Sequence, residues 1–230
     1  MIDLHSHILP GVDDGSVSVE MSCAMLNELQ TQGVETVVAT PHFYALQDAP
    51  EDFLRRRAEA AETLAAHTEN AVRLLLGAEI AYFDGLSSSE VPEKLQIGDT
   101  GLVLVEMPFC AWTQRMIREV CQIPVMTGLT PVLAHVDRYR DRKQLPKFQE
   151  ELLAQGILFQ CNAEAFLPRW DRRWALQMLR QGKIHFLGSD AHNLTTRAPK
   201  LDQAAKVITQ KLGQDALDDL TVFAESLLEQ

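Results

Sequence analysis

Residues 1–15 read MIDLHSHILPGVDDG and place two histidines at the end of a short apolar strand. Alternate residues of a strand point to the same face, so His5 and His7 are expected to project together. A proline and two glycines then turn the chain, which lets Asp13 or Asp14 return toward the two imidazoles. Imidazoles and a carboxylate that converge in this way predict a site for Zn²⁺, Mn²⁺ or Fe²⁺. The alternative is a polar loop with ordinary surface histidines.

The composition indicates one large acidic domain, residues 1–230. The chain has 46% hydrophobic residues and a formal net charge of −11, and an acidic chain without a basic run is a poor nucleic-acid binder. It has no apolar run long enough for a membrane span and no secretory leader. The four scattered cysteines form no C-x-x-C pair, which favours reduced thiols. We therefore expect a cytoplasmic protein that does not bind nucleic acid.

Apolar strand patterns alternate with helical patterns along the whole chain. The expected strands are residues 2–4, 34–40, 71–80, 101–107, 130–136, 157–162 and 185–188. The expected helices are residues 16–33, 50–70, 113–121, 143–155, 170–180, 199–212 and 215–228, with a short one at 92–95 inside a polar loop. This alternation predicts a parallel sheet covered by helices. Seven units favour an α/β fold of one domain, a distorted relative of the (β/α)₈ barrel, with an open doubly wound sheet as the alternative.

Acidic and imidazole side chains gather at one end of these expected strands. They lie at or just beyond the C-terminal ends in six of the seven units: His5 and His7, His42, Glu79, Glu106, His135, and Asp190 with His192. This is the functional end of both candidate architectures. The set exceeds what one tetrahedral zinc needs and predicts two or three ions with bridging carboxylates, for which Glu79 and Glu106 are candidates. Such sites activate water for displacement at phosphorus. For Glu79 alone, the alternative is a charged loop residue.

Two arginines follow ligand-bearing strands and are candidates for phosphate binding. Arg138 comes three residues after His135, and Arg197 follows Asp190 on the next such loop. A guanidinium can bind two phosphoryl oxygens at once, whereas the alternative is an ordinary surface arginine. His67 and His185 are not included in the site, because one lies at a helix end and the other begins a strand at the opposite end of the sheet.

A cysteine-dependent phosphatase is excluded by the spacing of the thiols. That chemistry needs a thiolate and an arginine on one phosphate loop, C-x₅-R. Residues 110–115, CAWTQR, are one residue too short and lack glycine. No other cysteine has an arginine at the required position, so the nucleophile has to come from elsewhere.

Five motifs together resemble a known family. HSHILPGVDDG, TPHF, GAEI, AHVDRY and GSDAHN are similar to motifs of the polymerase and histidinol phosphatase (PHP) superfamily. Within it they most resemble the bacterial manganese-dependent protein-tyrosine phosphatases of capsule and exopolysaccharide biosynthesis, the CpsB/CapC/YwqE type. The resemblance implies a distorted (β/α)₇ TIM-like barrel with up to three metal ions per chain. Mn²⁺ is the first choice, and Fe, Zn, Co and Mg are the alternatives.

The resemblance also implies a role for each candidate residue. The implied ligands are His5, His7, Glu79 and Asp190 for one ion, Glu79, Glu106 and His135 for the second, and Asp14, His42 and His192 for the third. Arg138 and Arg197 would bind the phosphoryl group, and a metal-bound water would be the nucleophile. Asp137 stands where the family motif often has glutamate, a mild departure that leaves the neighbouring arginine in place.

The activity implied by the resemblance is that of a protein-tyrosine phosphatase acting on a membrane-associated tyrosine autokinase. Self-association is also implied; residues 51–57, EDFLRRR, are a candidate contact, and a solvated helix face is the alternative. Two other functions fit the same ligands. One is a PHP phosphatase of a small molecule such as histidinol phosphate or a nucleotide, and the other is a non-catalytic metal-binding scaffold that docks on a kinase.

Overall fold

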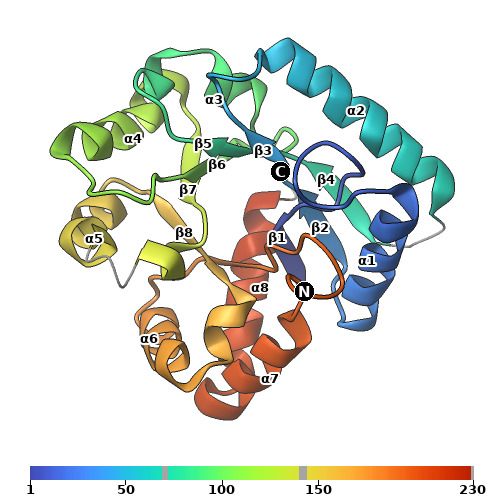
Figure 1. The fold of residues 1–230 in the computed structure, drawn as a ribbon. Helices are drawn as coiled ribbons and strands as arrows, with labels where there is room; N and C mark the ends of the chain where they lie inside the picture. The colour runs from blue at the N-terminus through green and yellow to red at the C-terminus, as the bar shows by residue number, and fades with distance from the viewer. Residues whose placement is uncertain (69–71, 140–143, 229–230) are drawn as a thin grey trace.

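The computed structural model describes residues 1–68, 72–139 and 144–228. Its strands all pair in parallel, in the orders β1-β2-β4 and β3-β5-β6-β7-β8-β9. They are β1 (Ile2–Ser6), β2 (Thr36–Ala39), β3 (His42–Phe43), β4 (Arg73–Leu76), β5 (Glu79–Ala81), β6 (Leu102–Glu106), β7 (Thr130–Leu133), β8 (Leu158–Asn162) and β9 (Phe186–Gly188). Figure 1 shows these strands at the centre of the molecule with helices around them.

The two sheets form one curled ring of seven strands. Two residues separate β2 from β3 and two separate β4 from β5, so each pair is one interrupted strand. Pairing continues across the interruptions, because Gly77 N donates to Ala39 O at 2.8 Å and Glu79 N to Pro41 O at 3.0 Å. A parallel bridge between Ser6 and Ala191 joins the two ends of the ring. The expected distorted seven-stranded barrel is confirmed, and the open doubly wound sheet is wrong.

The helices follow the strands in the expected order. They are α1 (Val19–Thr31), α2 (Pro50–His67), α3 (Val91–Lys94), α4 (Gln114–Thr127), α5 (Gln144–Ala154), α6 (Arg169–Arg180), α7 (Leu201–Leu212) and α8 (Gln214–Leu228), with 3₁₀ turns at Leu86–Ser88, Val136–Tyr139 and Ala163–Phe166. Ser18 caps α1 by accepting a hydrogen bond from Met21 N at 3.2 Å, as its residue type favours. Residues 70, 71 and 143, at the ends of expected elements, lie outside the described residues.

The strand expected at 34–40 continues after an interruption as β3, and two further elements differ from the expectation. The helix expected at 113–121 continues to Thr127 through Pro124, because the fully buried Ile123 holds this turn against the core and offsets the backbone hydrogen bond that proline removes. The strand expected at 71–80 is interrupted beside Gly77. A Cβ there would lie 2.9 Å from Ile97 Cγ1, so this close approach of loop and strand requires glycine.

A separate apolar cluster lies between the strands and α8. Leu4, Val38, Leu104, Val132 and Phe186 come from different strands, and they pack with side chains of α8.

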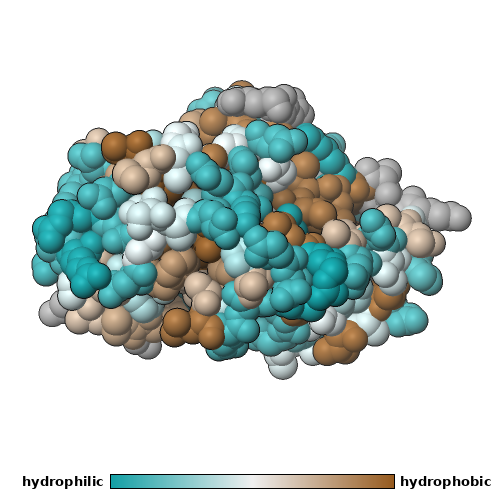
Figure 2. All heavy atoms as spheres, turned by 90° about the horizontal axis from the view of Figure 1, so that it is seen from above, coloured by the Kyte–Doolittle hydropathy of each residue, from teal (hydrophilic) through white to brown (hydrophobic). Residues whose placement is uncertain are grey.

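Figure 2 shows hydrophobic side chains in small areas between hydrophilic ones on one face of the molecule. In the part of the chain that the structure describes, no helix combines the length and apolarity that a membrane span requires.

Candidate metal and phosphate site

The two histidines of the opening segment converge at the end of β1. Both are fully buried, and their Nε2 atoms lie 3.1 Å apart. The pairing register of β1 with β2 shifts between Asp3 and Ser6, so the strand is not regular where the histidines leave it. The predicted common direction of His5 and His7 is confirmed.

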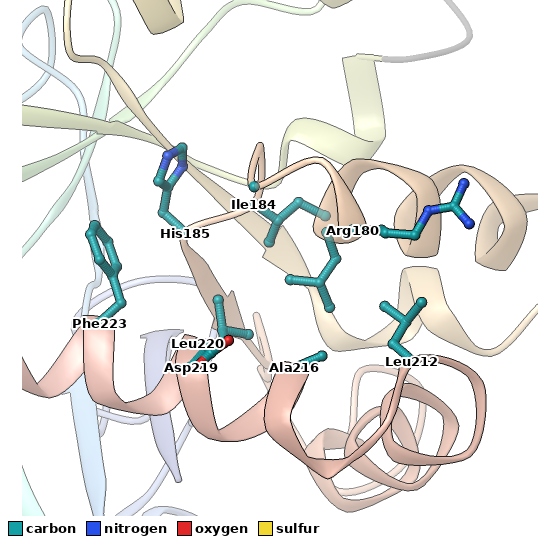
Figure 3. A pocket seen from close by; sticks show the side chains of 10 residues that line it. Arg180, Ile184, His185, Leu212, Ala216, Asp219, Leu220 and Phe223 are labelled. Carbon is teal, nitrogen blue, oxygen red and sulfur yellow. The ribbon is translucent and has the colours of Figure 1, made fainter.

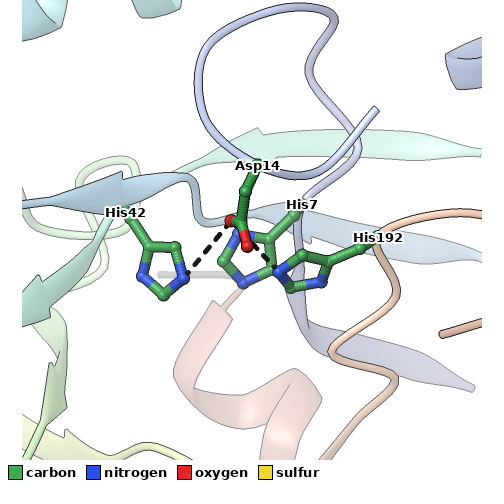
Figure 4. A group of neighbouring side chains, drawn as sticks. All are labelled: His7, Asp14, His42 and His192. Carbon is green, nitrogen blue, oxygen red and sulfur yellow. Dashed lines mark ion pairs between the residues drawn. The ribbon is translucent and has the colours of Figure 1, made fainter. Parts of the chain in front are cut away.

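The two acids of the following turn have different partners. Asp13 Oδ2 accepts the His7 Nδ1–H at 2.6 Å and the His42 backbone N–H at 2.9 Å. Asp14 Oδ1 instead faces the Nε2 atoms of His42 and His192, at 3.6 and 3.4 Å, as Figure 4 shows. Burial alone would raise the pKa of Asp13, but the contacts with His7 outweigh it and lower this pKa to about 2. Asp14 therefore faces the cluster, whereas Asp13 accepts a hydrogen bond from His7 Nδ1 and so orients that imidazole.

Glu79 lies at the centre of the cluster. Its Oε2 is 3.1 Å from His5 Nε2, 3.2 Å from His7 Nε2 and 3.1 Å from His42 Nδ1. Its Oε1 is 2.8 Å from His135 Nε2. The Glu79 side chain is 1% exposed, so one buried carboxylate faces four imidazoles. This arrangement excludes the alternative that Glu79 is an ordinary charged loop residue.

Carboxylates govern the protonation of these imidazoles. Burial alone would lower the pKa of His7 and of His135, but contacts with Asp13 and Glu79 raise the first to about 10, and those with Glu106 and Glu79 raise the second to about 9. Without a cation, protons therefore balance the negative charge of the cluster. Metal ligands must be deprotonated, so a bound cation would displace these protons.

Asp190 connects the cluster to both predicted arginines. Its Oδ1 lies 3.5 Å from His7 Nε2 and 2.7 Å from Arg197 Nη2. Its Oδ2 accepts hydrogen bonds from Arg138 Nη2 and, at 2.9 Å, from Asn162 Nδ2. Each arginine side chain is about one-third exposed. The two arginines therefore converge on one candidate metal ligand of the cluster, a shared contact that the sequence did not predict.

Backbone strain is concentrated at this site. Among the described residues, His135 and Asp190 are the only non-glycine residues with positive φ, at 31° and 50°. Such conformations cost on the order of 1–3 kcal/mol each and persist where the surroundings enforce them. Here Gln160 Oε1 accepts the His135 backbone N–H at 2.6 Å, and His5 O accepts the Asp190 backbone N–H at 2.7 Å. The strain directs both side chains toward the cluster.

The structure brings all nine candidate ligands together. Three sets have donor atoms within 4.8 Å of one another: His7, Asp14, His42 and His192; His5, His7 and Asp190; and His42, Glu79 and Glu106. His135 lies outside these sets but is 3.3 Å from Glu106 through Nε2. The sets overlap those implied by the resemblance without being identical, because His7 also joins the group around Asp14 and His42 joins Glu79.

The chemistry of the donor set fits metal ions. Glu79 Oε2, His42 Nδ1, His135 Nδ1 and His192 Nε2 are buried, and none of them makes a contact with hydrogen-bond geometry in the described part of the chain, although three of them lie within 3.4 Å of an opposite group. Buried polar atoms normally do make such bonds. The Nδ1 atoms of His5, His7 and His192 each face an acceptor, namely Gln160 Oε1 at 3.1 Å, Asp13 Oδ2 at 2.6 Å and Asp190 O at 3.0 Å. Donation there leaves each Nε2 lone pair available to a cation.

A family model for capsular polysaccharide synthesis proteins, CpsB/CapC, matches residues 1–228. The chain belongs to the CpsB/CapC family. Its curated relatives include tyrosine-protein phosphatase CpsB of Streptococcus agalactiae serotype III (strain NEM316), 30% identical over 100% of this chain and 98% of the relative. CpsB of Streptococcus pneumoniae is 32% identical over 96% and 95%. YwqE of Bacillus subtilis (strain 168) is 28% identical over 99% and 91%.

Solved structures agree with this family membership. One match is a crystal structure from work on YwqE of Bacillus subtilis and CpsB of Streptococcus pneumoniae, which are metal-dependent tyrosine phosphatases. It superposes with a TM-score of 0.87 at 27% identity, and the match covers 100% of this chain and 94% of that one. Histidinol phosphate phosphatase from Lactococcus lactis gives a TM-score of 0.57 at 14% identity over 92% and 93%. The latter shows a shared fold alone.

Two buried amides of the CpsB/CapC protein were missed by the sequence reasoning. Gln160 Oε1 accepts hydrogen bonds from His5 Nδ1 and from the His135 backbone, and Gln160 Nε2 donates to Asn162 Oδ1 at 3.0 Å. Gly188 leaves room for this amide, since a Cβ there would lie 2.6 Å from Gln160 Nε2. The available signal was the pair of amides at alternate positions of an otherwise apolar strand.

Replacing Gln160 is expected to weaken metal binding in this CpsB/CapC protein. Gln160→Leu keeps much of the side-chain volume but removes the acceptor that orients His5, and loss of such a partner lowers metal affinity about tenfold or more. Metal titration of the purified variant measures the effect, and the thermal unfolding midpoint of the metal-free protein reports folding. Unchanged metal affinity in a folded variant would contradict this role.

The two histidines that were left out of the site lie elsewhere. His67 is exposed, and its Nδ1 is 2.7 Å from Thr63 O. His185 precedes β9 at the opposite end of the ring and lines a hollow of about 620 Å³ beside α8. Figure 3 shows apolar side chains around this hollow and the Arg180 guanidinium directed away from them. The interpretation that neither histidine belongs to the site is confirmed.

Proposed function

We propose that this CpsB/CapC protein is a metal-dependent protein-tyrosine phosphatase that uses no cysteine nucleophile. The observation that carries the proposal is the buried Glu79 carboxylate facing four imidazoles, beside two arginines that hydrogen-bond to Asp190 of the same cluster. The relatives named tyrosine-protein phosphatases support it over nearly their whole length. The reaction is hydrolysis of a phosphomonoester to an alcohol or phenol and inorganic phosphate.

The nine side chains of the cluster are the proposed metal ligands, with Mn²⁺ as the first candidate and up to three ions per chain. The ligands are His5, His7, Asp14, His42, Glu79, Glu106, His135, Asp190 and His192. When bound, such ions supply Lewis acidity that activates water and neutralises charge on a phosphoryl group. Burial of the surrounding groups strengthens these electrostatic interactions relative to bulk water.

Arg138 and Arg197 are the proposed phosphate-binding residues. A planar guanidinium matches two phosphoryl oxygens, and fixed donors aimed at developing charge stabilise a transition state more than a ground state. A tyrosine leaving group, with a pKa of about 10, also departs more easily than an alkoxide. The proposed substrate is thus a phosphotyrosine protein, and a membrane-associated tyrosine autokinase is the candidate that the family resemblance favours.

The setting of the enzyme is also proposed. We place it in the cytoplasm as one domain spanning residues 1–230, with self-association as a further expectation. The candidate contact at residues 51–57 is partly engaged within the chain, since Arg56 pairs with Asp48 and Arg57 Nη1 donates to Gly77 O at 2.7 Å. This favours the alternative of an ordinary helix face for those two arginines.

A panel of phosphomonoesters assayed with Mn²⁺ tests the proposed activity. It contains a phosphotyrosine peptide, a phosphoserine peptide, histidinol phosphate and a nucleotide. The expected result is the highest kcat/KM for the phosphotyrosine peptide. A preference for histidinol phosphate or the nucleotide would identify a small-molecule phosphatase instead. No turnover of any ester by a metal-loaded protein would favour the scaffold function.

Cysteine is expected to be dispensable for this activity. Cys110 is exposed, and its Sγ donates a long hydrogen bond to Ala111 O at 3.8 Å. Cys110→Ser should leave kcat/KM on a phosphotyrosine peptide within about twofold, because exposed substitutions away from the site have small effects. Loss of turnover by a folded, metal-loaded Cys110→Ser protein would restore a thiolate mechanism.

A further inference from the structure

Tyr44 lies directly against the metal-site cluster without being a ligand. It follows β3, and its ring stacks on the His42 imidazole with centroids 5.3 Å apart and planes inclined by 30°. It is 39% exposed. One face of the ring therefore covers a candidate metal ligand, while part of the ring is open to solvent.

The exposed part of Tyr44 forms one wall of a hollow that opens on the site. The hollow measures about 530 Å³, and its lining includes Asp14 and His42 at one side and the Arg56–Asp48 pair at another. This volume is within the usual range for small-molecule sites, about 300–1,000 Å³. Of the lining side chains, only those of Tyr44 and His42 carry rings. The hollow thus offers one non-ligand aromatic surface next to the metal-site ligands.

The position of Tyr44 suits a fixed platform. Its carbonyl oxygen accepts backbone hydrogen bonds from Gln47 N at 2.9 Å and Asp48 N at 3.1 Å, which closes the turn that carries it.

We propose that Tyr44 is a specificity-determining residue whose ring supports the aromatic ring of an aryl phosphate ester while the phosphoryl group occupies the metal and arginine site. This inference rests on the proposed phosphatase function and adds a reason for selecting phosphotyrosine. Aromatic rings attract each other in offset or edge-to-face arrangements with centroids about 4.5–7 Å apart. An alkyl phosphate, such as a phosphoserine ester, lacks a ring and gains no such contact.

The test compares an aryl and an alkyl ester in the same metal-loaded protein. For Tyr44→Ala we expect kcat/KM on phenyl phosphate to fall roughly three- to tenfold, as loss of one aromatic pair predicts. We expect kcat/KM on glycerol 2-phosphate, the inhibition constant of inorganic phosphate and the metal content to stay unchanged. Tyr44→Phe should retain the wild-type aryl-to-alkyl ratio. Leu46→Ala, on the same turn and 98% exposed, is the matched control.

Phe109, like Tyr44, is a partly exposed aromatic residue whose ring stacks on a candidate metal ligand, so it serves as a comparison for Tyr44. It stacks on His135 with centroids 5.8 Å apart and an interplanar angle of 17°, and it is 40% exposed. It does not line the hollow beside Tyr44. Phe109→Ala should therefore leave the aryl-to-alkyl ratio unchanged, and a loss of the ratio in Phe109→Ala but not in Tyr44→Ala would overturn the assignment.

Other outcomes are equally decisive. An equal loss on both esters in Tyr44→Ala, or loss of metal, would mean that Tyr44 only supports His42. A loss in Tyr44→Phe as large as in Tyr44→Ala would assign the effect to the hydroxyl and overturn the ring platform. A wild-type protein that hydrolyses only the alkyl ester, or neither ester, would instead contradict the proposed tyrosine phosphatase function itself, before any variant is compared.

Discussion

Treatment with a chelator is expected to abolish phosphomonoester hydrolysis by this protein, and added Mn²⁺ is expected to restore it. The physical reason is the density of potential metal ligands: among the described residues, Glu79 Oε2, His42 Nδ1 and His192 Nε2 are buried close together, and none of them makes a contact with hydrogen-bond geometry. Elemental analysis of the purified protein should find more than one metal ion per chain, because the donors form more than one metal-sized set.

Glu79→Gln tests the same centre with a single substitution. The amide keeps the volume of the side chain but removes its charge and turns one acceptor into a donor beside imidazole nitrogens. We expect metal content to fall, and activity to fall at least about a hundredfold, since removal of one transition-state-stabilising group typically costs about 10²–10³ in kcat. Glu59→Gln on the exposed face of α2 is the matched control, because the Glu59 side chain is 64% exposed and pairs with Arg55 at 3.5 Å.

Two results would contradict the multi-metal proposal. One is a single bound ion per chain in fully active protein. The other is activity that is indifferent to chelators while the Glu79→Gln variant folds and turns over substrate at the wild-type rate. The first would leave a site for a single ion, and the second would return the imidazole and carboxylate cluster to a structural role.

Replacement of Arg138 or Arg197 by alanine is expected to lower activity roughly ten- to a hundredfold each. A charge-assisted hydrogen bond contributes about 1.5–3 kcal/mol, and a contact that strengthens in the transition state lowers kcat as well as kcat/KM when it is removed. Neither guanidinium can ligate a metal, because it stays protonated and offers no acceptor. Metal content and folding should therefore remain intact.

Lysine variants and metal analysis separate phosphate binding from support of Asp190. Arg138→Lys and Arg197→Lys should recover only part of the activity, because a point charge does not reproduce the planar fork. Arg115→Ala is the control, since Arg115 is exposed and pairs with Asp84 at 3.3 Å. If the alanine variants lose metal together with activity, the arginines act by holding Asp190. If both retain the wild-type rate on a phosphotyrosine peptide, the phosphate-binding assignment is wrong.

Much of the site follows from where the residues stand along the chain. The strand ends at His5, Glu79 and Glu106 could be located from apolar runs, and parallel pairing places such ends at one edge of a sheet. That prediction does not depend on any interatomic distance, because the alternation of strands and helices along the chain already implies parallel pairing. The same reasoning placed Arg138 and Arg197 beside the cluster, since both follow strands of that ring.

Contacts between distant segments determined the roles of individual residues that the local sequence pattern did not assign. The sequence by itself determined the alternating fold and the acids and imidazoles at the strand ends. The residue pattern did not separate Asp13 from Asp14, although the family resemblance implied Asp14, because their roles depend on the direction of one turn, and this turn is held by a hydrogen bond from His42 N to Asp13 Oδ2, 29 residues away. The role of Gln160 likewise depends on His5, 155 residues away. Hydrogen bonds between distant segments leave no periodicity in the sequence, so only the folded chain identifies these partners.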